Sequence, residues 1–198
     1  MRILAASDIH GDSKATKKLA ERAEREKADL VVLCGDLTGF TESKNLIKPF
    51  KDKGQKVLIL PGNWDSLATV DFLAQFYGVR NIHGYSATYE DVGFFGAGGA
   101  EGPGEGNIGE EEIMRNLEKA NSGLKNVKKK IMLTHAHPLG GESEFSGVEG
   151  SAAVRAAVEK FKPDFLFHGH IHEGEGLESK IGKTKVINVG KKGKIVEI

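Results

Sequence analysis

The chain has 198 residues, and its 28 lysine and arginine side chains balance 28 aspartate and glutamate side chains, which gives a formal net charge of zero. A neutral chain has no global electrostatic attraction to nucleic acid or to an anionic membrane, so we expect no membrane partner and the charge argues against nucleic acid. The length fits one domain that buries a sizeable core, and we expect a single domain over residues 1–198.

The single cysteine and the N-terminal sequence indicate in which cellular compartment the protein is expected. Cys34 is the only cysteine, so an intrachain disulfide is excluded, which suits a reducing compartment. No apolar stretch reaches the roughly 18 to 20 residues that a membrane-spanning helix needs. The N-terminus begins directly with a strand-like run, Arg2–Ala6, so we expect no signal peptide. We therefore expect a cytoplasmic protein, with the lysine clusters at 125–130 and 191–194 on its solvated surface.

Strand and helix patterns alternate through the first third of the chain. Short, continuous apolar runs predict buried strands over 3–6, 30–33 and 57–60. The intervening segments predict helices over 13–27, 41–50 and 67–76, the second of them capped by Thr41. Continuous apolar strands separated by amphipathic helices are typical of a parallel sheet that is covered on its faces.

The pattern changes in the middle of the chain. Residues 86–95 predict two short strands around a turn at Glu90-Asp91, and the glycine-rich stretch 96–109 predicts a mobile loop. Helices are predicted over 110–120 and 149–161, and strands over 130–133, 165–167, 176–181, 185–189 and 194–198. Antiparallel hairpins at the end of an otherwise parallel pattern indicate two mixed sheets packed together.

Five short pieces of sequence hold seven potential metal ligands. They are Asp8-Ile9-His10, Gly35-Asp36, Gly62-Asn63, Thr134-His135 and Gly169-His170-Ile171-His172. Three directly follow an apolar run that reads as a strand, and Gly62-Asn63 follows one with only Pro61 between. The carboxyl ends of the strands in an α/β fold share one crevice, so these side chains are expected to meet there. Two aspartates, one asparagine and four histidines suit a pair of divalent metals.

Each of the first three pieces has a structural alternative when it is taken alone. Asp8 could cap the helix that starts near Asp12, which would leave His10 on the surface. Asp36 and Asn63 could be ordinary turn residues. As a ligand, the Asp36 carboxylate has two oxygens and could bridge two cations roughly 3.5 to 4 Å apart. Asn63 would offer a neutral oxygen ligand.

The histidines are the sharper evidence. Four of the seven histidines lie in two His-x-His pairs, His135 with His137 and His170 with His172. Two such pairs at two strand ends are difficult to explain by structural roles, so we interpret the five pieces together as a metal centre. His83 and His168 lack a partner motif, and we interpret both as structural.

The charge of such a centre favours a phosphate substrate. Two divalent ions carry four positive charges, and Asp8, Asp36 and a bridging hydroxide contribute three negative charges. The centre keeps about one net positive charge, which attracts a phosphate anion. The metals would lower the pKa of the bridging water and so create the nucleophile. The hydroxide would attack phosphorus in line with the leaving oxygen, while the ions stabilise the charge on the equatorial oxygens.

These five ordered motifs resemble the calcineurin-like metallophosphoesterase superfamily over nearly the whole chain, and the compact length resembles its small prokaryotic phosphodiesterase branch. The resemblance implies a two-sheet sandwich flanked by helices, so we predict an α/β fold that is a four-layer αββα sandwich of two mixed sheets. It implies two divalent metal ions, with manganese favoured and iron, zinc, nickel or cobalt as candidates. By the same resemblance, one ion is held by Asp8, His10, Asp36 and His172, and the other by Asp36, Asn63, His135 and His170. The stretch 96–112 is similar to a glycine-rich insertion in some archaeal-type members.

Trp64 departs from the family pattern. The family commonly has a histidine directly after the motif asparagine, where it assists the leaving group, but an indole cannot act as an acid near pH 7. Small phosphodiesterases often lack this histidine too, so the departure points to that branch. His137 could supply the proton, or it could orient His135 from outside the ligand set, which we favour. Trp64 could stack on an aromatic part of the substrate or cover the metals.

These considerations give the remaining site assignments. We take Asp36, Asn63 and His137 as catalytic candidates, and Asn63, Trp64 and His137 as substrate-binding candidates. Asp65, which in the family would orient the missing histidine, is interpreted as a cap of the helix over 66–76. Asn188-Val189-Gly190, where the family often has a central proline, is expected to affect only turn stiffness.

Three other signals are negative. Residues 104–109 match the dinucleotide fingerprint by spacing, but glutamates 110–112 follow and would repel a pyrophosphate. Gly182-Lys183-Thr184 imitates the end of a P-loop, but Leu177 stands where the leading glycine belongs. No arginine follows Asp36 in residues 37–40, which argues against the protein serine/threonine phosphatase branch.

We expect a dinuclear metal-dependent phosphoesterase that acts on a small phosphate ester, with a diester favoured over a monoester. One alternative is a catalytically weak or inactive protein-interaction scaffold of the same fold, similar to the retromer subunit of the superfamily. A nuclease similar to the recombination-repair members would need a basic face for DNA, which the balanced charge disfavours. The sequence names no natural substrate, and it leaves an oligomer open.

Overall fold

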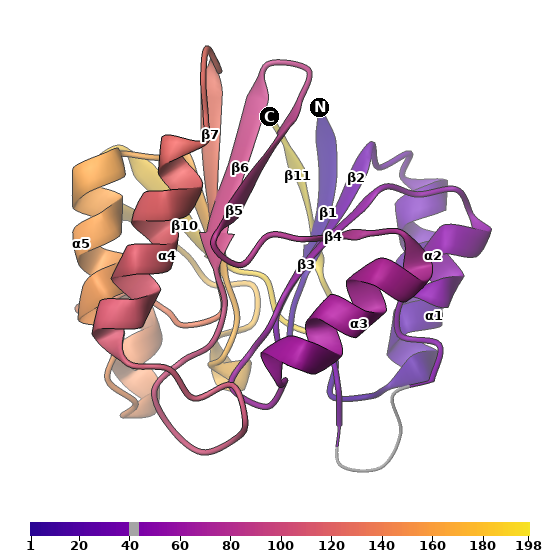
Figure 1. The fold of residues 1–198 in the computed structure, drawn as a ribbon, viewed down its shortest axis with the longest axis horizontal. Helices are drawn as coiled ribbons and strands as arrows, with labels where there is room; N and C mark the ends of the chain where they lie inside the picture. Colours follow the sequence, from indigo (N-terminus) through magenta and orange to yellow (C-terminus); the bar gives the residue numbers. More distant parts are fainter. Residues whose placement is uncertain (40–43) are drawn as a thin grey trace.

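The computed structural model describes residues 1–39 and 44–198. Two β-sheets pack face to face in the middle of the molecule, and helices cover their outer faces (Figure 1). Helices α1 (Ser13–Arg25), α2 (Lys48–Asp52) and α3 (Leu67–Tyr77) lie on one side, and α4 (Glu110–Ser122) and α5 (Ala152–Phe161) lie on the other. The predicted α/β sandwich of two mixed sheets flanked by helices is confirmed.

The first sheet has five strands in the order β11-β1-β2-β3-β4. Strands β1 to β4 run parallel, and the C-terminal β11 pairs antiparallel with β1. The bounds are β1 Arg2–Ala6, β2 Leu30–Cys34, β3 Val57–Leu60, β4 Arg80–Asn81 and β11 Lys194–Glu197. The sequence pattern did not predict β4, because two residues are too few to show a periodicity.

The second sheet has six strands in the order β5-β6-β7-β8-β10-β9. The four inner strands run parallel, and each edge strand pairs antiparallel with its neighbour. The bounds are β5 Tyr85–Tyr89, β6 Val92–Ala97, β7 Lys129–Thr134, β8 Phe165–His168, β9 Glu178–Ile181 and β10 Thr184–Asn188. The predicted hairpin at Glu90-Asp91 is therefore confirmed as β5–β6.

Local chemistry sets where the helices begin. Ser66 caps α3, because its hydroxyl accepts a hydrogen bond from the backbone N–H of Thr69, so the prediction that Asp65 caps this helix was wrong. Helix α2 begins at Lys48, later than the predicted range 41–50, and Pro49 lies in its first turn. A proline there is compatible with a helix start but would break the interior of a longer helix. The predicted cap Thr41 lies outside the described residues.

Three apolar layers hold the four structural layers together. One lies between the sheets, a second between the first sheet and α1 to α3, and a third between the second sheet and α4 and α5. Strand β2 contributes to two of these layers, since all five of its residues are buried and alternate between the two faces of the sheet. Among the described residues, the helices lack the length and apolar composition to cross a membrane.

Candidate metal centre

Four predicted ligands from separate parts of the chain meet at one point. Asp8, His10, Asp36 and His172 each offer one ligand atom, and these atoms all lie within 4.8 Å of one another. The first two follow β1, Asp36 follows β2, and His172 follows β8 in the other sheet. They meet because the carboxyl ends of these parallel strands open on a common crevice. This cluster could hold a divalent cation.

Three further predicted ligands form a second group beside the first. Oδ1 of Asn63 lies 3.0 Å from Nε2 of His135 and 3.1 Å from Nδ1 of His170. These residues follow β3, β7 and β8. The structure thus brings all seven predicted ligands to one edge of the sandwich.

Asp36 lies between the two groups. Its Oδ1 accepts a hydrogen bond from the backbone N–H of Trp64 over 2.9 Å. Its Oδ2 lies 3.5 Å from Nε2 of His10 in the first group and 3.4 Å from Nε2 of His135 in the second. One oxygen is therefore held by the backbone, while the other faces ligand atoms of both groups.

Backbone carbonyls orient two of the ligands. Nδ1 of His135 lies 2.9 Å from the carbonyl oxygen of Cys34, and a carbonyl can only accept. The proton of the neutral ring therefore lies on Nδ1, which leaves the Nε2 lone pair for a cation. Nδ2 of Asn63 donates to the carbonyl oxygen of Pro103 over 2.9 Å, so its Oδ1 faces the histidines.

The glycine-rich stretch after β6 supports Asn63 and its turn. The N–H of Gly99 donates to the carbonyl of Pro61, and that of Gly106 donates to the carbonyl of Asn63. A Cβ atom at Gly106 would lie 2.0 Å from the carbonyl oxygen of Gly62, so only glycine allows this approach. The segment expected to be a mobile loop is instead hydrogen-bonded to the Asn63 turn. Gly104 and Gly106 meet the backbone of this turn, which accounts for the first two glycines of the spurious dinucleotide spacing.

Asp65 is a residue whose role sequence reasoning missed. Its buried carboxylate accepts from the N–H groups of Leu37 and Thr38 after β2, over 3.0 and 2.8 Å, and from the N–H of Gly62 over 2.9 Å. It also accepts from the Thr38 hydroxyl over 2.6 Å. Asp65 therefore ties the turn that carries Asp36 to the turn that carries Asn63. In the sequence, the feature that pointed to this role was the position of Asp65 two residues after Asn63.

The backbone is strained at the candidate ligands. Asp8, His10, Asp36 and His170 have φ angles of 56°, 48°, 51° and 71°. Residues other than glycine occupy this left-handed region at an energetic cost, and such residues cluster at functional sites. Four of the seven candidate ligands therefore have this unusual backbone conformation.

The site has a negative potential that suits a cation. Burial alone would lower the pKa of His135, but the charges of Asp36 and Asp8 outweigh it and raise that pKa to about 9. Burial would raise the pKa of Asp8, but its hydrogen bond to His172 and the charge of His135 lower it to about 2. A negative potential that keeps the fully buried His135 ring positively charged also favours the binding of a metal cation.

The donor set fits divalent cations. Oδ2 of Asp8 is buried and has no hydrogen-bond partner among the described residues, which is costly for a carboxylate unless a cation binds there. Nε2 of His10 lies 3.1 Å from Nε2 of His172, so two ring nitrogens converge on one place. Oxygen and imidazole donors without a thiolate suit the borderline transition metals.

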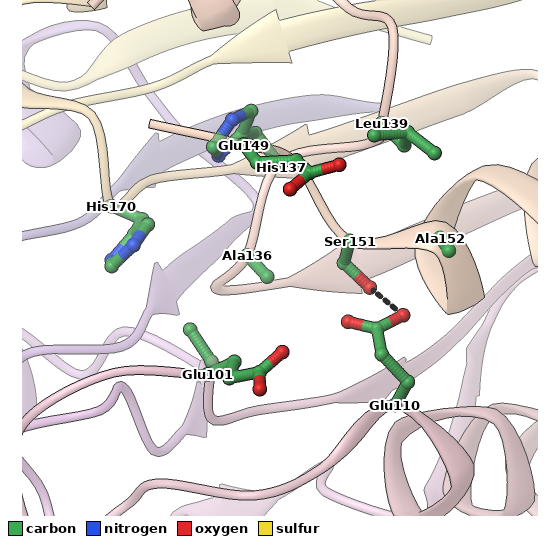
Figure 2. Close-up of a pocket in the computed structure, with 11 residues that line it drawn as sticks. Glu101, Glu110, Ala136, His137, Leu139, Glu149, Ser151, Ala152 and His170 are labelled. Carbon is green, nitrogen blue, oxygen red and sulfur yellow. Dashed lines mark hydrogen bonds between the residues drawn. The ribbon is translucent and has the colours of Figure 1, made fainter. Parts of the chain in front are cut away.

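His137 lies beside the ligands in a cavity of about 230 Å³, which Figure 2 shows. Its ring stacks on that of His170, with 6.1 Å between centroids, and its Nε2 lies 3.2 Å from the carbonyl oxygen of Val148. Among the described residues it makes no hydrogen bond to His135, whose orientation comes from Cys34. Glu101, Glu110 and Glu149 also line this cavity.

The two remaining histidines make structural contacts. Nδ1 of His83 accepts from the N–H of Gly98 over 3.0 Å, which fixes the start of the glycine-rich stretch. His168 is buried at the end of β8, where burial lowers its pKa to about 4 and keeps it neutral.

Comparison with known proteins identifies the family. The model of the calcineurin-like phosphoesterase family matches residues 1–174. The chain belongs to this family. The calcineurin-like phosphoesterases are metal-dependent phosphoric ester hydrolases, so the resemblance inferred from the five motifs is confirmed, and divalent metal cofactors are implied for the ligand groups described above.

Relatives of this calcineurin-like phosphoesterase include proteins from archaea and bacteria. An uncharacterized protein of Methanocaldococcus jannaschii, MJ1162, is 30% identical in an alignment of 210 positions that covers 99% of this chain and 91% of the relative. The crystal structure of TT1561 from Thermus thermophilus has a TM-score of 0.77 at 21% identity and covers 96% of this chain and 90% of that one. A structure described as a novel archaeal phosphodiesterase has a TM-score of 0.56 at 18% identity, with coverage of 96% and 84%. These structural likenesses concern the fold.

Proposed function

We propose that this calcineurin-like phosphoesterase is a dinuclear metal-dependent phosphodiesterase that hydrolyses a P–O bond of a small diester. The observation that carries the proposal is a cavity beside each of the two ligand groups. One, of about 230 Å³, lies against His137 and His170. The other, of about 190 Å³, lies against Asp8, His10 and His172. A phosphodiester has two organic arms, and these cavities can receive one each. The archaeal phosphodiesterase of the same fold is a precedent.

The two ligand groups divide the seven side chains between two ions. In this proposal Asp8, His10, Asp36 and His172 hold one, and Asp36, Asn63, His135 and His170 hold the other, with manganese favoured. Divalent ions in such a site supply Lewis-acid stabilisation of phosphate charge and lower the pKa of bound water. The position of Asp36 Oδ2, which faces His10 and His135, supports its assignment as the shared ligand.

The protein side chains supply orientation rather than proton transfer. Asp65 and the glycine-rich stretch hold the Asp36 and Asn63 turns at a fixed separation. Such preorganisation matters because the donors need not rearrange as charge develops on the phosphate. His137 is a positioning residue in this scheme, since it stacks on His170 and its Nε2 is engaged by the Val148 carbonyl.

Charge in the larger cavity favours a diester over a monoester. Glu101, Glu110 and Glu149 line it, and none of the described lysines and arginines does. A monoester dianion is repelled more strongly by these carboxylates than a diester monoanion is. Trp64 agrees with this preference, because the indole cannot protonate a poor leaving group.

A metal-restoration assay tests the proposal. The protein is stripped with a chelator, reloaded with Mn²⁺ or Ni²⁺, and assayed with bis-p-nitrophenyl phosphate and p-nitrophenyl phosphate. We expect hydrolysis only after reloading, with the diester preferred. Asp52→Asn is the matched control, because Asp52 is exposed and pairs with Lys48 on the surface, and surface pairs contribute little. Absence of hydrolysis in protein that binds two ions per chain would favour the scaffold alternative.

A further inference from the structure

The smaller cavity beside the ligand cluster shares a lining residue with a basic groove. Lys191 lines the cavity together with Asp8, His10 and His172, and it also lines a larger groove of about 480 Å³ along helix α1. The basic groove is lined by Asp12, Lys14, Ala15, Lys18, Leu19, Arg22, Lys191 and Lys192. Five of these residues are cationic and one is acidic.

The sequence places the cations of the basic groove on two facing elements. Lys14, Lys18 and Arg22 are four residues apart in turn, so they form one stripe along α1. The turn after β10 supplies Lys191 and Lys192. Arg22 fixes that turn against the helix, because its Nη1 donates to the carbonyls of Lys192 and Gly193 over 3.0 and 2.9 Å. Contacts within the protein therefore fix the two sides of the groove relative to each other.

Part of the positive charge of the groove is uncompensated. Asp12 pairs with Lys191 over 2.9 Å, Arg22 pairs with Glu26 over 3.1 Å, and Lys192 pairs with Glu175 over 3.7 Å. Among the described residues, Lys14 and Lys18 make no ion pair, and both are exposed. Several cations gathered along one groove attract an anion more strongly than isolated surface lysines do.

The cavity that borders the second ligand group has the opposite charge. This cavity, beside His137 and His170, is lined by the carboxylates of Glu101, Glu110 and Glu149, which Figure 2 shows around it. The zero net charge of the chain thus conceals a separation of charge across the site. A substrate with additional negative charge on one arm can bind in only one favourable orientation.

We propose that the substrate is an asymmetric phosphodiester that carries a further phosphate group on one arm, and that the basic groove binds this group. The inference rests on the proposed phosphodiesterase function. Lys18 is a specificity-determining residue for the further phosphate, because it projects from the middle of the cationic stripe. The arm without the phosphate occupies the acidic cavity.

Dinucleotides that differ only in a terminal phosphate test this proposal. The manganese-loaded protein is assayed with TpT, pTpT and TpTp, and we expect one of the two phosphorylated forms to have a kcat/KM about tenfold higher than that of TpT. The identity of the better form gives the orientation. Lys18→Glu should remove most of this preference. Lys17→Glu, which makes the same charge change one residue away and outside the groove, should leave it unchanged.

Salt dependence and binding provide independent readouts. Raising the ionic strength from about 0.05 M to about 0.5 M should reduce the preference, because the groove is open to solvent. Thymidine 3′,5′-bisphosphate should bind more tightly than thymidine 5′-monophosphate in calorimetry, and Lys18→Glu should abolish the difference. Equal rates for all three dinucleotides, or an equal loss in Lys17→Glu, would overturn the proposal. If bis-p-nitrophenyl phosphate is not hydrolysed, the proposed function fails, and the calorimetric comparison decides on the groove separately.

Discussion

The backbone N–H of Trp64 donates a hydrogen bond to Oδ1 of Asp36 over 2.9 Å. Because this bond comes from the main chain, the residue type at position 64 can change without releasing Asp36. Trp64 follows the candidate ligand Asn63 in the chain and is 37% exposed, so a different side chain can be accommodated at this position.

Replacement of Trp64 by histidine should raise turnover of monoesters relative to diesters. A histidine there can donate a proton to a leaving group near neutral pH, which an indole cannot do, and such general acid catalysis contributes roughly 10²-fold or more. The measurement is the ratio of kcat/KM values for phenyl phosphate and diphenyl phosphate, whose phenol leaving group is more basic than p-nitrophenol, with Trp64→Phe as the control that removes the indole but adds no acid. An unchanged ratio in Trp64→His would count against proton donation as the missing step.

Asp36→Asn should abolish hydrolysis and most of the bound metal. The amide keeps the shape of the carboxylate but removes the charge that faces His10 and His135. In the parent protein, Mn²⁺ at about 100 times its dissociation constant should stabilise the fold by about 2.7 kcal/mol, a shift in melting temperature of about 5–10 °C. We expect this shift to vanish in Asp36→Asn and to persist in Asp52→Asn. A variant with a near-parental rate and metal content would remove Asp36 from the shared-ligand role.

Asp65→Asn should destabilise the fold and weaken metal binding together. Asp65 is fully buried, and its carboxylate accepts four hydrogen bonds that an amide can only partly replace. We expect the free energy of unfolding to fall by about 2–4 kcal/mol in chemical denaturation. The metal dissociation constant, measured by titration below the unfolding transition, should rise as well. Loss of stability with unchanged metal affinity would show that Asp65 does not set the separation of the two turns.

Gly106→Ala should disturb the site from a distance. The added methyl group would meet the carbonyl oxygen of Gly62 at 2.0 Å, so the glycine-rich stretch must move away from the Asn63 turn. We expect a loss of about 1–3 kcal/mol in stability and a weaker second metal site. Gly109→Ala is the matched control, because a Cβ atom there would meet nothing within 4 Å. If the two variants behave alike, the contact between this stretch and the turn is unimportant.

Removal of the His83 imidazole should make the stability of the folded state depend less on pH under acidic conditions. Burial lowers the pKa of His83 below its ordinary 6.5, and Nδ1 must stay unprotonated to accept from Gly98. Below pH 6.5 the unfolded chain therefore binds more protons than the folded one, so the stability of the folded state falls as the pH drops toward the folded pKa. Melting temperatures measured with chelator present, between about pH 7.5 and pH 5, should fall less steeply in His83→Gln than in the parent. Parallel slopes would mean that His83 titrates normally.

The candidate ligands followed from local sequence, and so did the order of strands and helices along the chain, apart from the two-residue β4. Residues such as Asp8 and His170 follow closely after short, continuous apolar runs, which predict buried strands. The ends of the helices were predicted less accurately, because a single residue can shift where a helix begins. Helix α2 begins just before Pro49, and Ser66 rather than Asp65 caps α3.

The support of the ligands and the distribution of charge around them depend on the folded arrangement. The carboxylate of Asp65 joins two turns, the glycine-rich stretch docks on Asn63, and Lys191 lies beside the stripe that contains Lys18. No periodic sequence pattern reveals these contacts, because each joins segments that meet only when the strands are in register. Net charge is a sum over the whole chain, so it could not reveal that opposite charges are gathered in different parts of the site.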